Sequence, residues 1–221
     1  SHMNIGADHL HWGRAALALR EMMTAESLNP KNPRIQYALG EVYLMRDRPA
    51  EAEQHFLQAL VLQEGLHDAR LSLSALYIVQ ARYEEAIAAC QQLLDDPTFP
   101  APWRALANRG WSEYRLGRSA DARGSLSLAR EYREGYWPAM LSMAVLEAAE
   151  GNRLEAIGLL QELIELGPGP GVESEANYRL ARNYVALGKR TRAMRYLTTA
   201  VDRAPDGEWA RRSQDYLKLL H

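Results

Sequence analysis

Small and large apolar residues return along the chain at nearly fixed intervals. The clearest marker is an alanine within a stretch of mixed polarity, and it stands at Ala18, Ala52, Ala86, Ala122, Ala156 and Ala193. Successive markers are 34, 34, 36, 34 and 37 residues apart. Fixed periods between about 20 and 50 residues are typical of proteins built from stacked repeats. The pattern therefore predicts one structural unit that occurs six times.

Two further positions stand at a constant distance from the marker alanine in every unit. A small residue stands 12 positions before it in every unit, at Gly6, Gly40, Ser74, Gly110, Ala144 and Ala181. A larger apolar residue stands 4 positions after it, at Met22, Phe56, Cys90, Leu126, Leu160 and Leu197. Small side chains let two helices approach closely, and the larger one fills the space toward the next unit at the density of a protein interior.

Each unit reads as two helices joined by a tight turn. In the second unit Leu39-Gly40-x-x-Tyr43 precedes Ala52, and Phe56-x-x-Ala59 follows. This order matches the tetratricopeptide repeat (TPR), in which W-x2-L-G-x2-Y is followed by A-x3-F. Glycine occupies the expected turn in four units, at Gly13, Gly117, Gly151 and Gly188. The sequence therefore predicts an all-α TPR solenoid, a right-handed superhelix of six helix-turn-helix repeats.

The expected repeats span residues 4–32, 33–66, 67–102, 103–136, 137–173 and 174–207, in a single solenoid over residues 4–221. Residues 208–221 are expected to form a capping helix, because an end repeat would otherwise leave an apolar face in water. Residues 1–3, Ser-His-Met, look like the remnant of a cleaved expression tag. The two longer steps fall on proline-rich connectors, residues 95–103 and 166–174, and Ser174 is the expected N-cap of the next helix.

Composition narrows the function classes. The net charge of -2 gives no general reason to expect a nucleic-acid partner. The single cysteine, Cys90, excludes an internal disulfide and a cysteine-based zinc site. His9 and His11 are poorly placed on a helix to share a metal ion, and no nucleotide-binding glycine loop is present. We therefore expect a non-enzyme with no catalytic residue, no metal and no cofactor.

A partner surface is expected on the first helices of the repeats, which line the concave face of such a solenoid. The positions that face it are largely apolar over repeats two to five. The residues expected to bind a partner there are Tyr37, Leu44, Leu71, Ile78, Val79, Trp111, Tyr114, Leu141 and Val145. A continuous exposed apolar patch usually marks a binding site, and aromatic residues such as Trp111 and Tyr114 are the expected anchors.

Charge is unevenly distributed, and its meaning stays open at this point. Residues 174–221 hold ten Lys and Arg against five Asp and Glu. The basic stretch 188–195 suits anionic lipid headgroups or an acidic partner, but an ordinary solvated helix surface explains it as well.

The order of features is also similar to that of one particular family. Six repeats, a proline-containing insertion at residues 95–103 and the following Asn108-x-Gly110 resemble the PilF/PilW/Tgl family of type IV pilus pilotins, which are TPR lipoproteins of the outer membrane. The resemblance runs from Ile5 to about Leu220. It implies a binding scaffold on the periplasmic face of the outer membrane, anchored by a lipid on a cysteine upstream of this sequence. It further implies that the partner is a secretin subunit, whose assembly the protein promotes.

Two other readings remain compatible with the repeats. The alternative to a pilotin is a cytoplasmic TPR adaptor in a motility, signalling or secretion complex. The chain would also suit accessory repeats attached to a separate catalytic domain. The three readings differ in what precedes residue 4: a lipidated cysteine, a regulatory tail or an enzyme.

Overall fold

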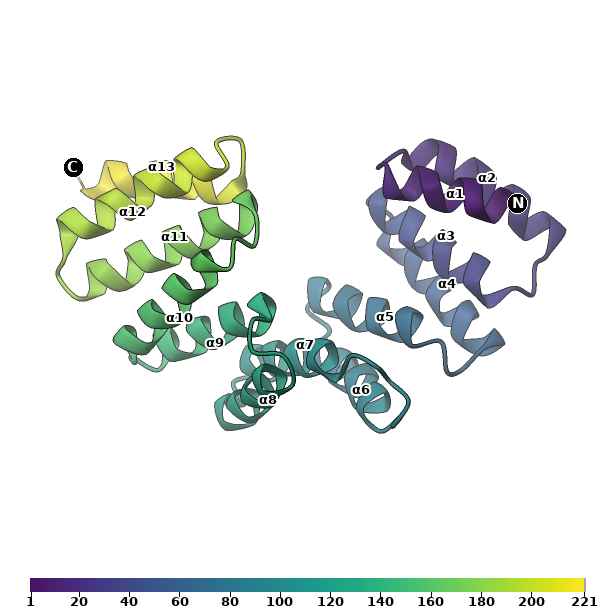
Figure 1. Ribbon diagram of the computed structural model, residues 1–221, viewed down its shortest axis with the longest axis horizontal. Coiled ribbons are helices and arrows are strands. Elements are labelled where there is room, and N and C mark those ends of the chain that lie inside the picture. The colour runs from purple at the N-terminus through teal and green to yellow at the C-terminus, as the bar shows by residue number, and fades with distance from the viewer. Residues whose placement is uncertain (221) are drawn as a thin grey trace. The chain divides into compact units, whose positions relative to one another are not determined.

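A computed structural model describes residues 1–220, and over these residues the chain forms thirteen α-helices and no strand (Figure 1). The helices are α1 (His2–His11), α2 (Ala15–Leu28), α3 (Pro33–Met45), α4 (Pro49–Leu62), α5 (His67–Val79), α6 (Tyr83–Leu94), α7 (Pro102–Arg115), α8 (Ser119–Tyr132), α9 (Trp137–Ala149), α10 (Arg153–Glu165), α11 (Pro170–Ala186), α12 (Arg190–Arg203) and α13 (Glu208–Leu220). None of these helices combines the length and apolar character needed to cross a membrane.

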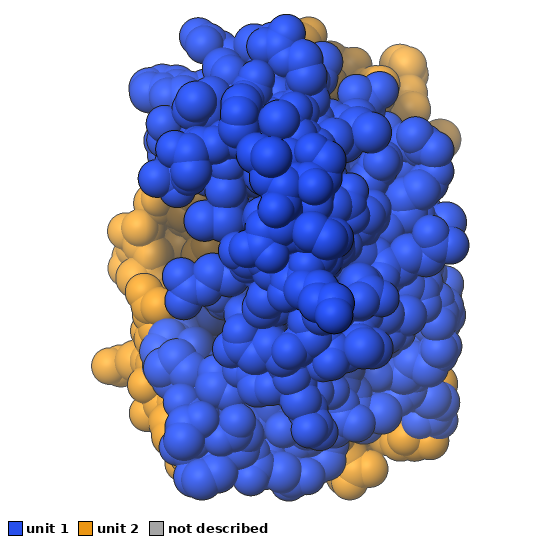
Figure 2. Space-filling view, turned by 90° about the vertical axis from the view of Figure 1, so that its right-hand side faces the viewer, with its two compact units in different colours: residues 1–112 blue, residues 113–221 orange. Residues whose placement is uncertain are grey.

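The chain forms two compact units, residues 1–112 (unit 1) and residues 113–221 (unit 2), which are distinguished by colour in Figure 2. In unit 1, α1 packs on α2, α3 on α4 and α5 on α6. In unit 2, α9 packs on α10 and α11 on α12. Each unit thus contains stacked helical hairpins. The division between the units falls inside α7, so the expected fourth repeat, residues 103–136, does not lie within one unit. That all six repeats form a single solenoid stays a prediction.

The marker alanines lie where the two helices of a hairpin meet. All six have no exposed surface, and the same holds for the larger residues four positions later. In unit 1, Gly40 shows why the earlier small position matters: a Cβ added there would lie 2.4 Å from Cε1 of Phe56. Non-bonded carbon atoms do not approach so closely, so any larger residue at this place would force the ring of Phe56 or the backbone to shift.

The turn inside each hairpin contains a backbone hydrogen bond that spans five residues. These bonds run from the amide of Arg14 to His9, Arg48 to Tyr43, Arg82 to Tyr77, Arg118 to Glu113, Asn152 to Glu147 and Lys189 to Tyr184, with N···O distances of 2.8–2.9 Å. The residue before each donor has a positive φ, between 56° and 89°, as in a Schellman helix end. Asp47 and Ala81 adopt this conformation although they are not glycines.

Ala81→Gly is therefore expected to raise the free energy of unfolding by about 0.5–1 kcal/mol. Ala81 has φ 58°, a backbone conformation in which a Cβ costs roughly 1–2 kcal/mol. Glycine removes this cost, but it also raises the conformational entropy of the unfolded chain, which offsets part of the gain in stability. Urea denaturation measures the change. Ala88→Gly, at an exposed site inside α6, is the control and should lower stability by about 1 kcal/mol. Loss of stability in the Ala81 variant would contradict this account of the turn.

Two helix starts differ from the sequence expectation. Helix α1 begins at His2 and is capped by Ser1, whose Oγ accepts a hydrogen bond from the amide of Asn4 at 3.5 Å, so the first helix starts before residue 4. Helix α11 begins at Pro170, because proline suits the first turn of a helix. Ser174 therefore lies inside α11 and is not its N-cap; its buried Oγ donates to the carbonyl of Ala200 at 2.7 Å.

The proline-rich connector before α7 is held by specific contacts. His67 Nε2 lies 2.8 Å from Asp96 Oδ2, and the amide and hydroxyl of Thr98 donate to Asp96 Oδ1 at 2.8 and 2.7 Å. These hydrogen bonds lower the pKa of Asp96 to about 2. The connector places Phe99 in a buried cluster with Leu71 and Cys90. The segment is therefore part of the core of unit 1 rather than a free linker.

The last helix closes unit 2. Helix α13 packs on α12 and α11, and its Ala210 and Ser213 are buried. The rings of Trp209 and Tyr216 lie 5.3 and 6.2 Å from the ring of Tyr178 on α11. The amphipathic face expected for a capping helix thus rests on the preceding hairpin.

Candidate functional site

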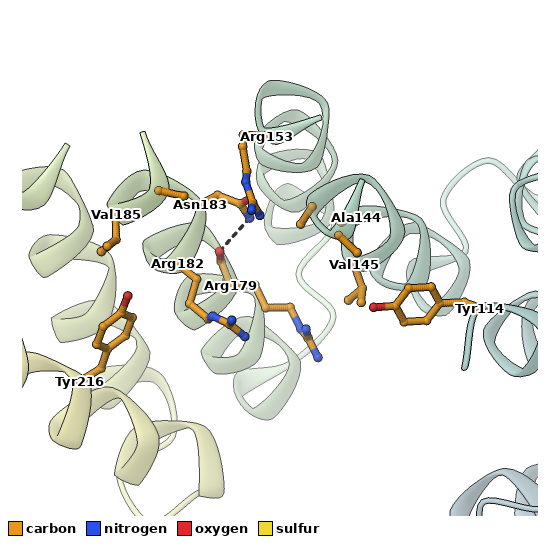
Figure 3. A pocket seen from close by; sticks show the side chains of 12 residues that line it. Tyr114, Ala144, Val145, Arg153, Arg179, Arg182, Asn183, Val185 and Tyr216 are labelled. Atoms are coloured by element: carbon orange, nitrogen blue, oxygen red, sulfur yellow. Dashed lines mark hydrogen bonds between the residues drawn. The ribbon is translucent and has the colours of Figure 1, made fainter. Parts of the chain in front are cut away.

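Unit 2 contains a hollow of about 470 Å³ between its helices (Figure 3). Its lining comes from the end of α7, from α9, from the first residue of α10, from α11 and from α13. In Figure 3, Tyr114 and Tyr216 stand at opposite ends of the view, and the side chains of Arg153, Arg179 and Arg182 lie between them. We call this feature the unit 2 hollow.

One wall of the unit 2 hollow is apolar. It consists of Ala144, Val145, Ala148 and Ala149 on α9, with Val185 and Ala186 on α11. Three of the α9 residues are alanines, so the helix backbone lies close to the open space, and an extended segment has room to approach it. The wall arises because α9 is apolar on its exposed face as well as on its packed face.

The three arginines of the hollow differ in their partners. Arg179 forms an ion pair with Glu175, with Nε 2.8 Å from Oε1, and its guanidinium lies over the ring of Trp209 at 5.1 Å. Arg153 Nη1 donates to Asn183 Oδ1 at 3.4 Å, a long hydrogen bond to an uncharged group. Arg182 is exposed and has no ion-pair partner among residues 1–220.

The lining carries positive charge without a balancing carboxylate. Asn183 is held in place because its Nδ2 donates to the carbonyl of Arg179 at 2.9 Å, so it orients Arg153 rather than neutralising it. Only Arg179 is neutralised, by Glu175. The hollow also lacks a histidine, cysteine or serine in its lining. This arrangement suits the binding of an anionic group more than acid–base or nucleophilic chemistry.

A metal site is not evident in the part of the chain that the structure describes. Within residues 1–220 no three or more His, Cys, Asp or Glu side chains lie together in a way that could hold an ion. Cys90 is fully buried in the core of unit 1, where it packs as a small apolar residue.

Some of the partner-binding residues expected from the sequence lie at this hollow. Tyr114 and Val145 line it, and both side chains are partly exposed. Leu141, one turn earlier on α9, is half-buried and does not line the hollow. Trp111 lies on the part of α7 that belongs to unit 1 and is also half-buried.

The apolar groove expected over repeats two and three is largely absent from unit 1. Leu71 is only 5% exposed, because the connector places Phe99 in the same cluster. Three further expected residues pack against the core of the hairpins instead of lying free, namely Tyr37, Leu44 and Ile78. Val79 alone among the unit 1 residues expected on α3 and α5 is strongly exposed, at 83%.

Polar groups occupy part of the expected groove in unit 1. Ser72 Oγ donates to Glu41 Oε1 at 2.8 Å. Burial raises the pKa of Glu41 above its ordinary value, and burial together with the charge of Glu41 raises the pKa of Tyr37 to about 12. A buried carboxyl and its hydrogen bond thus interrupt the apolar face that the sequence predicts along α3 and α5.

Sequence reasoning missed the arginines that dominate the unit 2 hollow. Arg182 occupies the repeat position that Val145 and Glu41 occupy in their own repeats. The same register, applied to the sixth repeat, would have placed Arg182 on the partner-facing side. The basic excess of residues 174–221 was the available signal, but it did not show which cations share a hollow.

Comparison with known proteins agrees with this architecture. One tetratricopeptide repeat profile matches residues 8–70, 71–135 and 108–171, and a second matches residues 147–212. None of the curated protein sequences matches the chain.

Solved structures share the fold at low identity. The crystal structure of PilW, described as a widely conserved type IV pilus biogenesis factor, has a TM-score of 0.84 at 19% identity, and the match covers 96% of both chains. PilF of Pseudomonas aeruginosa has a TM-score of 0.78 at 18% identity, over 97% of this chain and 96% of its own. A tetratricopeptide repeat protein from Parabacteroides merdae has a TM-score of 0.73 at 22% identity, over 91% and 78%. Since the repeat profiles together span most of its length, the chain belongs to the tetratricopeptide repeat family.

Proposed function

We propose that this member of the tetratricopeptide repeat family is a pilotin, a non-enzymatic scaffold that binds secretin subunits and promotes their assembly for type IV pili. The observation that carries the proposal is the likeness to PilW, which extends over 96% of both chains. The Parabacteroides merdae protein shares the fold as well, but the match covers only 78% of its chain. A shared fold does not by itself determine function, so the proposal is an analogy in fold and chain length, and the binding experiment below tests it.

The proposed mechanism is binding at the unit 2 hollow. An unassembled secretin subunit exposes segments that it buries later in the ring, and such segments aggregate when they are left free. The hollow offers an apolar wall beside Val145 and an aromatic side chain at Tyr114 to cover such a segment. Aromatic residues commonly supply most of the binding energy at interfaces of this kind.

The proposal includes a place in the cell. As a pilotin the protein would sit on the periplasmic face of the outer membrane, attached by a lipid at a cysteine upstream of residue 4. One acyl chain gives marginal membrane attachment, and a bound partner at the same membrane adds a second contact. Together the two attachments keep the scaffold and the secretin subunit at the membrane in which the ring forms.

Tyr114→Ala is expected to weaken binding of a purified periplasmic secretin fragment by about tenfold, because it removes an aromatic anchor at the edge of the hollow. Biolayer interferometry measures the affinity, and circular dichroism checks that the variant keeps its helical content. The matched control is Tyr132→Ala on α8, a tyrosine that is 58% exposed and does not line the hollow.

The controls separate the outcomes of this experiment. Normal affinity in Tyr132→Ala together with weak affinity in Tyr114→Ala supports binding at the hollow. If the unaltered chain does not bind secretin fragments at all, the assignment as a pilotin is wrong. Equal affinity in all three proteins would remove the hollow from the mechanism.

A further inference from the structure

Two of the three arginines that line the unit 2 hollow have no carboxylate partner among the residues that the structure describes. Arg182 is exposed without an ion-pair partner within residues 1–220, and Arg153 has only an uncharged hydrogen-bond partner, Asn183. Arg179, on the same helix as Arg182, is by contrast neutralised by Glu175. Two guanidinium groups therefore face one concave space with no carboxylate in its lining. A concave surface of one charge sign concentrates the electric field and favours a ligand of the opposite sign.

The surroundings of these arginines define the kind of anion. Arginine presents a planar fork of donors that matches a carboxylate with two parallel hydrogen bonds. The adjoining wall of Val145, Ala148 and Val185 suits an apolar side chain next to that carboxylate. Tyr114 and Tyr216 line the same hollow as the arginines, so aromatic rings are also available to contact a bound segment (Figure 3).

We infer that the unit 2 hollow recognises an acidic side chain within a protein segment, with Arg182 and Arg153 binding its carboxylate and the α9 wall contacting its apolar neighbours. The identity of the segment as part of a secretin subunit rests on the proposed function, but its chemistry follows from the lining of the hollow. A lipid surface is a poorer occupant because the cations lie in a recess lined by helices. A nucleic acid is a poorer occupant because the chain as a whole carries a net charge of -2.

The inference is tested with two kinds of probe. The first is a set of overlapping peptides that cover the periplasmic domains of a type IV pilus secretin, each made also with Asp and Glu replaced by Asn and Gln. The second is a phage-displayed library of random peptides, selected on the full chain without reference to any secretin. Binding is measured by fluorescence anisotropy at low and high salt.

Acidic peptides are expected to bind, and their neutral counterparts to bind at least about tenfold more weakly, since a charged hydrogen bond is lost. Arg182→Gln should cause a similar loss, and Arg182→Lys a smaller one, because lysine keeps the charge but not the fork. The matched control is Arg195→Gln, an exposed arginine of α12 that does not line the hollow. Library selection should enrich Asp and Glu beside apolar residues, and the affinity should fall as salt rises.

The results distinguish this inference from the proposed function. Secretin peptides that bind equally well with or without their acidic groups, and equally well to Arg182→Gln, would overturn the inference and leave the pilotin assignment intact. Library peptides that need Arg182, in the absence of any secretin binding, would support the inference and contradict the pilotin assignment. A library that yields only neutral binders, or none, overturns the inference.

Discussion

Phe56→Ala will lower the free energy of unfolding by about 3–5 kcal/mol, the usual cost of emptying a large buried aromatic site. Phe56 has no exposed surface and lies in the core cluster of unit 1 with Leu73 and Leu76. Its ring centroid is 5.8 Å from that of Tyr37, and its edge lies directly against Gly40. Residues on three successive helices, α3, α4 and α5, thus lose contacts when the ring is removed.

Urea denaturation followed by circular dichroism measures this effect. Leu57→Ala is the matched control, because Leu57 is the next residue of α4 and is 45% exposed; its change should stay below about 1 kcal/mol. Gly40→Ala gives a second check. Alone it should destabilise by about 1–3 kcal/mol through overpacking, but in the Phe56→Ala background it should be neutral or stabilising, since alanine is the better helix former. If the changes in unfolding free energy of Gly40→Ala and Phe56→Ala simply add in the double variant, the close approach between Gly40 and the ring of Phe56 is contradicted.

The helical hairpins were predictable from sequence because their determinants are local and repeated. A residue such as Ala52 or Ala156 must be small wherever two helices of one hairpin touch, and six such residues at intervals of 34 to 37 make chance agreement improbable. The turns were predictable only in part. Glycine marked four of them, but at Asp47 and Ala81 the backbone takes a positive φ against the preference of the side chain. There the packing of the hairpin decides the conformation, and no local signal reveals it.

The candidate site was predictable in position but not in character. The repeat register placed Tyr114 and Val145 on the surface that lines the unit 2 hollow. It did not show that Leu71 would be buried, because that depends on where the proline-rich connector places Phe99. The prediction from the repeat register used only apolar residues, so it did not assign Arg153 and Arg182 to the site. The charge of a side chain is visible in the sequence, but whether a neighbour neutralises it is decided by the fold.

The sequence alone also does not explain why a carboxylate replaces tyrosine at the repeat position nine residues before the marker alanine. Tyr43 and Tyr77 occupy this position in repeats two and three, and each lies under an arginine. In repeat five the residue is Glu147, which is 4% exposed. Its partner, Arg123, comes from α8 of the preceding repeat and also pairs with Glu150. Only the folded structure shows that a bond between repeats compensates the buried charge.

Arg123→Met is accordingly expected to destabilise the chain by about 2–3 kcal/mol at pH 7. Breaking a buried ion pair costs about 3–5 kcal/mol, and the smaller value allows for the 40% exposure of the Arg123 side chain. Asn152 Nδ2, at 2.7 Å from Glu147 Oε2, would remain as the only side-chain donor to the buried carboxylate seen in residues 1–220. Arg195→Met, at an exposed site of α12, is the control and should change stability by less than about 0.5 kcal/mol.

The loss of stability in Arg123→Met should also shrink as the pH falls, and this dependence tests its cause. In the unaltered chain burial acts to raise the pKa of Glu147, but the hydrogen bonds from Arg123 and Asn152 hold the pKa below its ordinary value of 4.5. Glu147 therefore contributes stability above that value, and the contribution is lost as the pH falls through the lowered pKa. Removal of Arg123 takes away two of the causes that lower the pKa of Glu147 and leaves burial, the largest cause, acting to raise it, so the pKa is expected to rise and protonation then relieves the buried charge. Urea denaturation of both proteins at about pH 7 and pH 5 should show a smaller difference in unfolding free energy at the lower pH.

A double variant, Arg123→Met with Glu147→Met, should recover part of the loss of stability at pH 7, because it removes both partners of the pair. An equal difference at both pH values would mean that Arg123 acts through packing of its side chain and not through the charge of Glu147.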